Sequence, residues 1–120
     1  MDELKLGVVE SRFADIIWNH EPLHSRELVK LCEIELNWKK PTTYTVLRKL
    51  CERGIFRNEG GTVSAVITRQ EFYAMQSQRF VEETFEGSLP AFLAAFTTRR
   101  ELSPEEIAEI RRMIASYGEG

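Results

Sequence analysis

Apolar residues recur at helical spacing through the first third of the chain. Four of them, at i, i+4, i+7 and i+8 from Val9, predict a helix over residues 8–18. Pro22 interrupts the pattern, and Ser25 is a suitable N-cap for a second predicted helix over residues 26–36. The chain is therefore expected to begin with two short amphipathic helices joined by a turn.

A third helix is predicted from Pro41, which suits the first helical position, to Gly54, which suits a left-handed stop. Two β-prone runs then surround Gly60 and Gly61 within residues 55–67, a pattern typical of a β-hairpin. Three helices followed by a hairpin match the winged helix-turn-helix plan, in which the third helix enters the major groove of DNA. The predicted fold class is mainly α, with a small β-hairpin wing.

Three further helical segments are predicted after Thr68. One begins with a capping box between Thr68 and Glu71, one is the short stretch "LPAFLAAF", and the last is "SPEEIAEIRRMIASY". Their apolar seams have few partners within so short a chain, which favours a self-associating surface. We expect that dimer interface to include Tyr73, Phe80, Phe92, Phe96, Ile107, Ile110, Ile114 and Tyr117.

The third predicted helix has two faces. An advance of about 100° per residue places Val46, Leu47 and Leu50 on the core face, together with Thr43. The other face presents hydroxyl groups and cations, which hydrogen-bond phosphates and base edges. The residues assigned to DNA contact are Lys39, Lys40, Thr42, Thr43, Tyr44, Thr45, Arg48 and Lys49, with Arg57 and Asn58 on the hairpin.

The charge distribution supports this assignment. The chain has 120 residues and a formal net charge of −3, which argues against nonspecific coating of nucleic acid. Residues 39–57 nevertheless contain six Lys or Arg and a single acid, a local net charge of +5. A basic segment on an acidic chain indicates a specific anionic partner, for which we expect a double-stranded DNA operator.

Other chemistry finds little support in the sequence. Cys32 and Cys51 lie far apart and are interpreted as reduced thiols, and Pro22 separates His20 from His24. No enzyme, metal site or cofactor is therefore expected. The first residues do not resemble a secretory signal and no apolar run could span a membrane, so we expect a cytoplasmic protein without direct membrane insertion. A winged-helix adaptor that binds protein instead of DNA is the alternative.

Two motifs resemble a known family. The first helix ends in "IIW", and the pattern W-x-x-x-T-x-x-T-x-L-x-x-L-x-x-x-G runs from Trp38 to Gly54. Together they resemble the penicillinase-repressor family, the BlaI, MecI and CopY transcriptional repressors. The segment "LSPEEIAEIRRMI" is similar to the final dimerisation helix of that family, so the resemblance covers nearly the whole chain.

The resemblance implies a homodimeric transcriptional repressor that binds a palindromic operator. It implies an N-terminal winged helix-turn-helix domain and a C-terminal helical dimerisation domain. We place these at residues 1–68 and 69–120, because the predicted hairpin is followed by a helix that opens at Thr68. The recognition threonines of the family fall on Thr42 and Thr45, whereas its basic residue between them is replaced by Tyr44. Lys39 stands where the family often has a capping serine.

The resemblance also bears on how such a repressor is released. Antibiotic-responsive members are cleaved at an Asn-Phe bond, often under the control of a neighbouring membrane sensor-protease. The matching bond here is Ala95–Phe96, which keeps the phenylalanine and replaces the asparagine. Copper-responsive members have a cysteine-rich tail, but no cysteine follows Cys51, so copper sensing is not expected.

Overall fold

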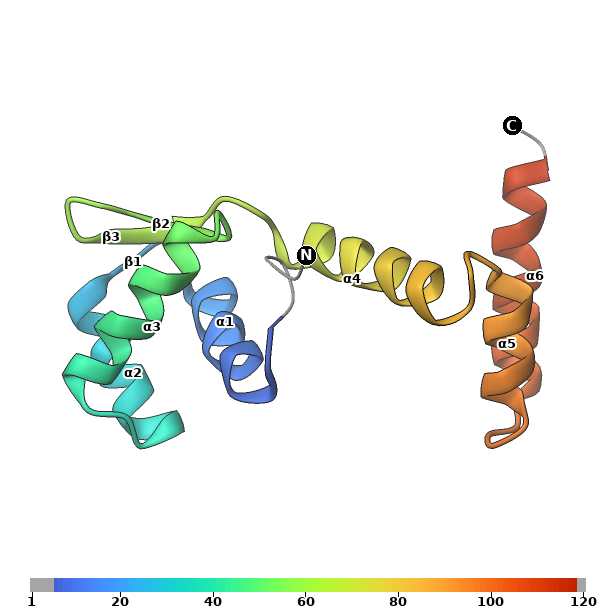
Figure 1. Ribbon diagram of the computed structural model, residues 1–120, viewed down its shortest axis with the longest axis horizontal. Coiled ribbons are helices and arrows are strands. Elements are labelled where there is room, and N and C mark those ends of the chain that lie inside the picture. The colour runs from blue at the N-terminus through green and yellow to red at the C-terminus, as the bar shows by residue number, and fades with distance from the viewer. Residues whose placement is uncertain (1–5, 119–120) are drawn as a thin grey trace. The chain divides into compact units, whose positions relative to one another are not determined.

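The computed structural model describes residues 6–118, which form six helices and three short strands (Figure 1). The elements are α1 (Val8–His20), β1 (Leu23–His24), α2 (Ser25–Leu36), α3 (Lys40–Glu52), β2 (Phe56–Glu59), β3 (Thr62–Ala65), α4 (Arg69–Thr84), α5 (Leu89–Thr97) and α6 (Pro104–Gly118). The predicted fold class, mainly helical with a small wing, is confirmed. The chain divides into two compact units between Gln78 and Arg79, within α4.

The first unit has a continuous apolar core to which α1, α2, α3, the strands and the start of α4 all contribute. Its largest fully buried side chains include Phe13, Phe56 and Phe72. Most of the predicted inward positions of the first three helices are confirmed, but Val9 of α1, which the helical spacing placed on the apolar stripe, is 50% exposed. The buried apolar cluster consists of Leu6, Phe13, Ala14, Ile16, Ile17, Leu23, Leu28, Cys32, Leu47, Leu50, Ile55, Phe56, Val63 and Phe72.

Trp18, near the end of α1, joins three parts of this unit. Its ring centroid lies 5.4 Å from that of Phe56 in β2 and 5.5 Å from that of Phe72 in α4. Its indole Nε1–H donates a hydrogen bond of 3.0 Å to the carbonyl of Ile67. A ring of this size buries a large apolar area while its N–H keeps a partner, so Trp18 is a packing anchor.

The start of α2 differs from the sequence prediction, because His24, not Ser25, is the N-cap. The Nδ1 atom of His24 accepts a hydrogen bond of 3.1 Å from the N–H of Arg26, and its own N–H donates to Glu27 Oε1 at 3.1 Å. Ser25 is the first helical residue and is buried. Leu23 and His24 form β1, whose two residues are too few to produce a recognisable sequence period.

The wing is a hairpin with a third strand added to it. Strands β2 and β3 pair antiparallel, with Asn58 opposite Val63, and β1 pairs with the other edge of β3 to give the order β1-β3-β2. Gly60 and Gly61 form the turn with φ values of 61° and 94°, a backbone region that favours glycine. The predicted Gly-Gly hairpin is confirmed, whereas the pairing with β1 was not predicted.

The second unit has no comparable core, since none of residues 79–118 is buried. The rings of Phe80, Phe85 and Phe92 contact one another, with centroid separations of 5.6–6.1 Å. The predicted capping box of α6 is confirmed: Ser103 N–H donates to Glu106 Oε1, and Glu106 N–H donates to Ser103 Oγ, each at 3.0 Å. The helices of the second unit are therefore capped by hydrogen bonds between neighbouring residues, although they have few packing contacts with distant parts of the chain.

The two turn glycines are expected to differ in their tolerance of alanine. A Cβ at Gly61 would lie 2.7 Å from His24 Nε2, whereas a Cβ at Gly60 would meet no atom within 4 Å. We expect Gly61→Ala to lower the free energy of unfolding by about 1–3 kcal/mol. Gly60→Ala should cost about 1 kcal/mol, from backbone strain alone.

Urea denaturation of the two variants measures this difference. The ring of His24 cannot move aside freely because its Nδ1 caps α2. Equal midpoints for Gly60→Ala and Gly61→Ala would show that the ring does yield at no cost.

Candidate nucleic-acid interface

The two faces of α3 are those that the helical spacing predicted. Leu47 and Leu50 are buried against the core, whereas Thr42, Thr45 and Arg48 are exposed. The helix begins with Pro41 among its first residues and has no acidic side chain in its first turn. Its exposed face therefore offers hydroxyl groups near the positive helix end and a guanidinium about two turns further along, which suits phosphate and base edges.

Thr43 does not belong to this exposed face. Its relative exposure is 0%, and it lies on the same side of α3 as Leu47 and Leu50. Its side chain cannot reach a duplex, so the inclusion of Thr43 among the DNA-contacting residues was wrong.

Burial raises the pKa of the neighbouring Cys32 thiol to about 11, an effect that the Thr43 hydroxyl opposes and Glu35 reinforces.

Tyr44 occupies the edge between the two faces and is half-buried. Its hydroxyl forms a hydrogen bond of 3.0 Å with the Ser25 hydroxyl at the start of α2. The phenol therefore has a hydrogen-bond partner within the protein. The helical spacing of α3 could not reveal this partner, because Ser25 belongs to α2. Lys39, the N-cap residue of α3, and Lys40 are exposed and make no side-chain capping bond.

An acid from α1 changes the charge pattern at the far end of α3. Glu10 forms ion pairs with Lys49 at 3.2 Å and with Arg53 at 3.6 Å. Burial by itself would raise the pKa of Glu10. The Gly7 N–H hydrogen bond, with Lys49 and Arg53, outweighs burial and lowers that pKa. The local charge of +5 counted along the sequence is thus partly neutralised in space, because Glu10 pairs with two of the six cations.

The two residues of the wing that were predicted to contact DNA differ in their hydrogen bonding. Arg57 and Asn58 are both exposed on β2. The Oδ1 atom of Asn58 accepts a hydrogen bond of 3.0 Å from the N–H of Gly61, so this side chain shapes the turn. Arg57 lies opposite Ser64 in the ladder and supplies the positive charge of the wing.

In the second unit, the residues predicted for a dimer interface are largely exposed. The exposed fractions are 51% for Phe80, 63% for Ile114 and 88% for Tyr117. Tyr73 belongs to the first unit, where its ring contacts those of Trp18 and Phe72. The other residues of the predicted seam are half-buried or exposed: Phe92, Phe96, Ile107 and Ile110.

The bond between Ala95 and Phe96 lies in the last turn of α5. The carbonyl of Ala95 accepts hydrogen bonds from the Thr98 hydroxyl at 2.7 Å and from the Thr98 N–H at 3.3 Å. Phe96 is 40% exposed, and Arg100 lies 5.5 Å from its ring centroid. This bond is therefore near the surface but held in helical conformation.

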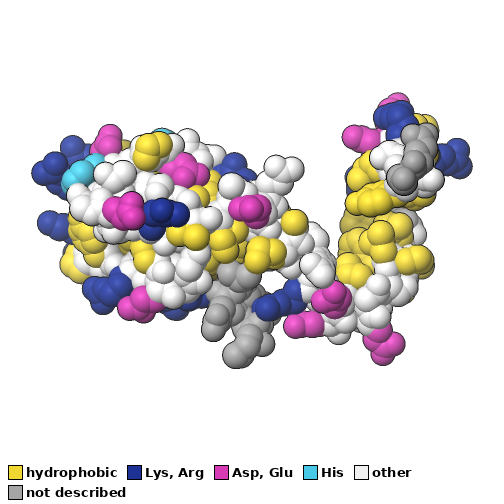
Figure 2. Space-filling view, turned by 90° about the horizontal axis from the view of Figure 1, so that it is seen from above, with side chains coloured by type: hydrophobic (Ala, Val, Ile, Leu, Met, Phe, Trp, Pro, Cys, Tyr) yellow, Lys and Arg dark blue, Asp and Glu magenta, His cyan; other side chains and the backbone are white. Residues whose placement is uncertain are grey.

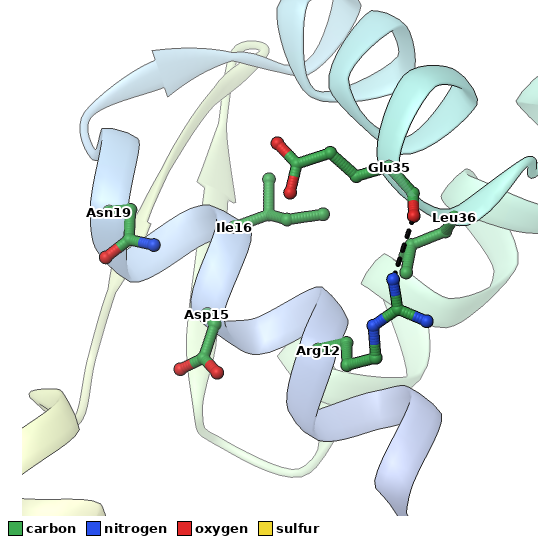
Figure 3. A pocket seen from close by; sticks show the side chains of 6 residues that line it. All are labelled: Arg12, Asp15, Ile16, Asn19, Glu35 and Leu36. Atoms are coloured by element: carbon green, nitrogen blue, oxygen red, sulfur yellow. Dashed lines mark hydrogen bonds between the residues drawn. The ribbon is translucent and has the colours of Figure 1, made fainter.

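A shallow pocket lies between α1 and α2, with a volume of about 200 Å³ (Figure 3). Arg12 donates a hydrogen bond of 2.9 Å across it to the carbonyl of Glu35. Its lining contains no residue of α3 or of the wing, so the pocket is separate from the exposed face of α3. The residues that line it are Arg12, Asp15, Ile16, Asn19, Glu35 and Leu36.

Both histidines form hydrogen bonds within the protein, and both cysteines are free thiols. A ring nitrogen of His20 lies 2.8 Å from the carbonyl of Ile16, and His24 caps α2. Both Cys32 and Cys51 are free, and burial raises the pKa of each thiol. Within residues 6–118, no three His, Cys, Asp or Glu side chains gather in a way that could hold a metal ion. Over the same range, no helix combines the length and apolar character needed to cross a membrane.

The geometry defines a class of protein. A three-helix core, a third helix with an exposed hydroxyl-rich and basic face, and an adjacent hairpin wing characterise winged helix-turn-helix proteins of transcription regulation.

Comparison with known proteins gives the family. The chain belongs to the penicillinase repressor family, whose sequence model matches residues 6–116. A penicillinase repressor from Bacillus licheniformis is 24% identical over 117 residues, covering 94% of this chain and 91% of the relative. The methicillin resistance regulatory protein MecI of Staphylococcus aureus strain Mu50 is 19% identical over 114 residues, covering 92% of this chain and 93% of that protein.

The ion pairs of Glu10 predict an acid-dependent loss of stability. Because the folded-state pKa of Glu10 is lowered, its carboxylate stabilises the fold above the unfolded-state pKa. That stability is lost as the pH falls from about 5 through the lowered pKa. We expect Glu10→Gln to be less stable than the parent at neutral pH and to lose less stability on acidification.

Urea titrations at a series of pH values test this expectation. Glu33→Gln, which removes an exposed carboxylate of α2, is the matched control and should retain the acid dependence of the parent. An acid dependence in Glu10→Gln as steep as that of the parent would contradict the assignment.

Proposed function

We propose that this chain is a sequence-specific transcriptional repressor that binds a palindromic DNA operator as a homodimer. The observation that carries the proposal is the exposed face of α3, where Thr42 lies in the first turn, at the positive helix end, and Thr45 and Arg48 follow along the helix. The names of its relatives, a penicillinase repressor and a methicillin resistance regulator, support the same role. Repression of this kind requires no catalytic chemistry, so we assign no enzymatic activity.

Contacts to bases and contacts to phosphates have different roles in this proposal. Arg48 and the threonine hydroxyls would read base edges in the major groove, where a guanidinium pairs with guanine and a threonine methyl packs on thymine. Lys39, Lys40 and Arg57 would contact phosphates and fix the register without reading sequence. Lys49 would contribute less, because it already forms an ion pair with Glu10.

Homodimer formation is proposed from the state of the second unit. Its helices expose apolar side chains, and Figure 2 shows hydrophobic atoms covering much of the visible surface of the C-terminal helices. With no buried residue between positions 79 and 118, these helices gain a core only by packing against another surface. A second copy would supply that surface with two-fold symmetry, which matches a palindromic operator.

The division of labour and the mode of release are part of the same proposal. We assign residues 1–68 to DNA binding and residues 69–120 to dimerisation. Release by a sensor-protease would require cleavage near Ala95–Phe96, and the last turn of α5 would first have to unwind. We also propose a cytoplasmic location, because the operator is there.

A protein-binding adaptor is the alternative that the winged-helix fold leaves open. Such an adaptor would use the same basic face for an acidic protein and would show no salt-sensitive affinity for any duplex. A DNA-binding protein must release counterions from phosphates, so its affinity falls steeply as salt is raised. Gel shifts at several salt concentrations, with a duplex from the promoter region upstream of its own gene, separate the two functions.

Base reading by α3 predicts a loss of affinity for single substitutions. We expect Thr45→Ala and Arg48→Ala each to weaken operator binding by about 1–3 kcal/mol. Arg112→Ala removes an exposed arginine from α6 and is the matched control, with affinity expected to stay near that of the parent. Unchanged affinity in both α3 variants would refute the assignment of this helix as the reader.

The proposed dimer predicts the effect of a charge in the α6 seam. Ile114→Glu places a carboxylate in an apolar contact, and we expect monomers in sedimentation equilibrium together with much weaker operator binding. Ala108→Glu adds the same charge about 120° around α6 from Ile114, away from the centre of the seam, and should remain dimeric. An unchanged dimer for Ile114→Glu would exclude this seam as the interface.

A further inference from the structure

Ser25 connects the wing to the start of α2 through its backbone. Its N–H donates a hydrogen bond of 2.7 Å to the carbonyl of Gly61, the second residue of the wing turn. The preceding residue, His24, pairs with Thr62 in the sheet. The turn of the wing is therefore held against the first residue of α2 by main-chain hydrogen bonding, which no side-chain substitution removes directly.

The side chain of the same residue connects α2 to α3. The hydroxyls of Ser25 and Tyr44 share a hydrogen bond of 3.0 Å, and Ser25 is only 6% exposed. A hydroxyl at that burial has little access to water, so the loss of its partner is costly. Tyr44 lies between Thr42 and Thr45 along the chain, next to the exposed face proposed to read DNA.

The contact between the wing turn and α2 is also tightly packed. The space where a Cβ of Gly61 would stand is filled by the His24 ring, at 2.7 Å from Nε2. That ring is held in place because its Nδ1 accepts the N–H of Arg26. The wing turn thus has little freedom to shift relative to Ser25, and Ser25 transmits its position to Tyr44.

We infer that the hydroxyl pair of Ser25 and Tyr44 is a clasp that fixes the wing relative to α3 for DNA binding. In this inference Tyr44 is a positioning residue and does not read a base or contact a phosphate. The inference rests on the proposed function, because the value of a fixed wing lies in the simultaneous contact of Arg57 and the α3 face with one duplex.

Loss of the clasp should change the affinity for DNA in a specific way. A duplex has a fixed spacing between its major groove and the adjacent backbone, so a rigid protein that matches this spacing binds without an ordering cost. Loss of the clasp should allow the wing to sample other orientations relative to α3. Affinity should then fall without the removal of any phosphate contact, so the dependence of affinity on salt should keep its slope.

Three variants separate positioning from simple stability. Tyr44→Phe keeps the ring but leaves the buried Ser25 hydroxyl without its partner. Ser25→Ala removes that hydroxyl, and the double variant removes both groups together. We expect Tyr44→Phe to lower both stability and affinity, and the double variant to recover stability because it leaves no unpaired buried hydroxyl. Affinity in the double variant should stay about five- to tenfold below the parent, since the clasp is absent.

The measurements are urea denaturation and fluorescence anisotropy with a labelled duplex from the promoter region upstream of the chain's own gene, at several salt concentrations. Ser77→Ala, which removes an exposed hydroxyl bonded to the Tyr73 carbonyl, is the matched control and should bind like the parent. Recovery of full affinity in the double variant would reduce the clasp to a stability role. A shallower salt slope in Tyr44→Phe would instead show that phosphate contacts of lysine or arginine side chains were lost, and either result overturns the inference.

Hydrogen exchange of the Ser25 amide tests the clasp without DNA. This amide donates to Gly61, so its protection reports the contact between the wing turn and α2. We expect lower protection in Tyr44→Phe and in the double variant than in the parent, while the Phe13 amide in α1 keeps its protection in the double variant. Unchanged protection of Ser25 would overturn the clasp. A parent that binds no duplex would contradict the proposed function, whatever the exchange result.

Discussion

The packing of Trp18 ties α1 to the wing and to α4 in the first unit. This indole lies against Phe56 of the wing and Phe72 of α4, and it donates to the Ile67 carbonyl between them. The guanidinium of Arg69 lies 5.7 Å from its ring centroid and pairs with Asp15 on the same helix as Trp18. One side chain of α1 therefore anchors both the beginning of the wing and the beginning of α4. Phe56 of the wing packs on Trp18 and is followed directly by Arg57, so this contact also helps to position Arg57 beside α3.

Electrostatics then divides α3 into two parts. Glu10 reaches from α1 to Lys49 and Arg53, so the end of α3 is tied to α1 by ion pairs. The start of α3 has no acid in its first turn and keeps exposed lysines and hydroxyls. The positive end of the helix dipole lies at that same start, so the anion-binding groups and the favourable field coincide. The second unit is stabilised differently. Hydrogen bonds between neighbouring residues cap its helices, but none of residues 79–118 is buried.

Much of this arrangement could be predicted from local pattern. The inward placement of Leu47 and Leu50 and the outward placement of Arg48 follow from the 3.6-residue period, because one face of a helix on a small core must be apolar. The Gly60-Gly61 turn and the capping boxes at Thr68 and Ser103 are equally local, since each depends on residues at most three positions apart. Ser25 was misassigned because a serine before a helix is a common N-cap, and the pairing of His24 with Thr62 shifts the true cap by one residue.

The sequence by itself therefore determined the helices, the wing, the exposed face of α3 and the family resemblance, because these depend on short-range periods and motifs. Only the tertiary structure decided that Glu10 forms an ion pair with Lys49, that the hydroxyl of Tyr44 is bound by Ser25, and that Gly61 and Ser25 meet. The partners in these contacts are separated by 39, 19 and 36 positions along the chain, and no helical or strand period relates them. Such contacts arise only when the core brings α1, α2, α3 and the wing together, and they determine which polar groups on α3 remain available to a partner.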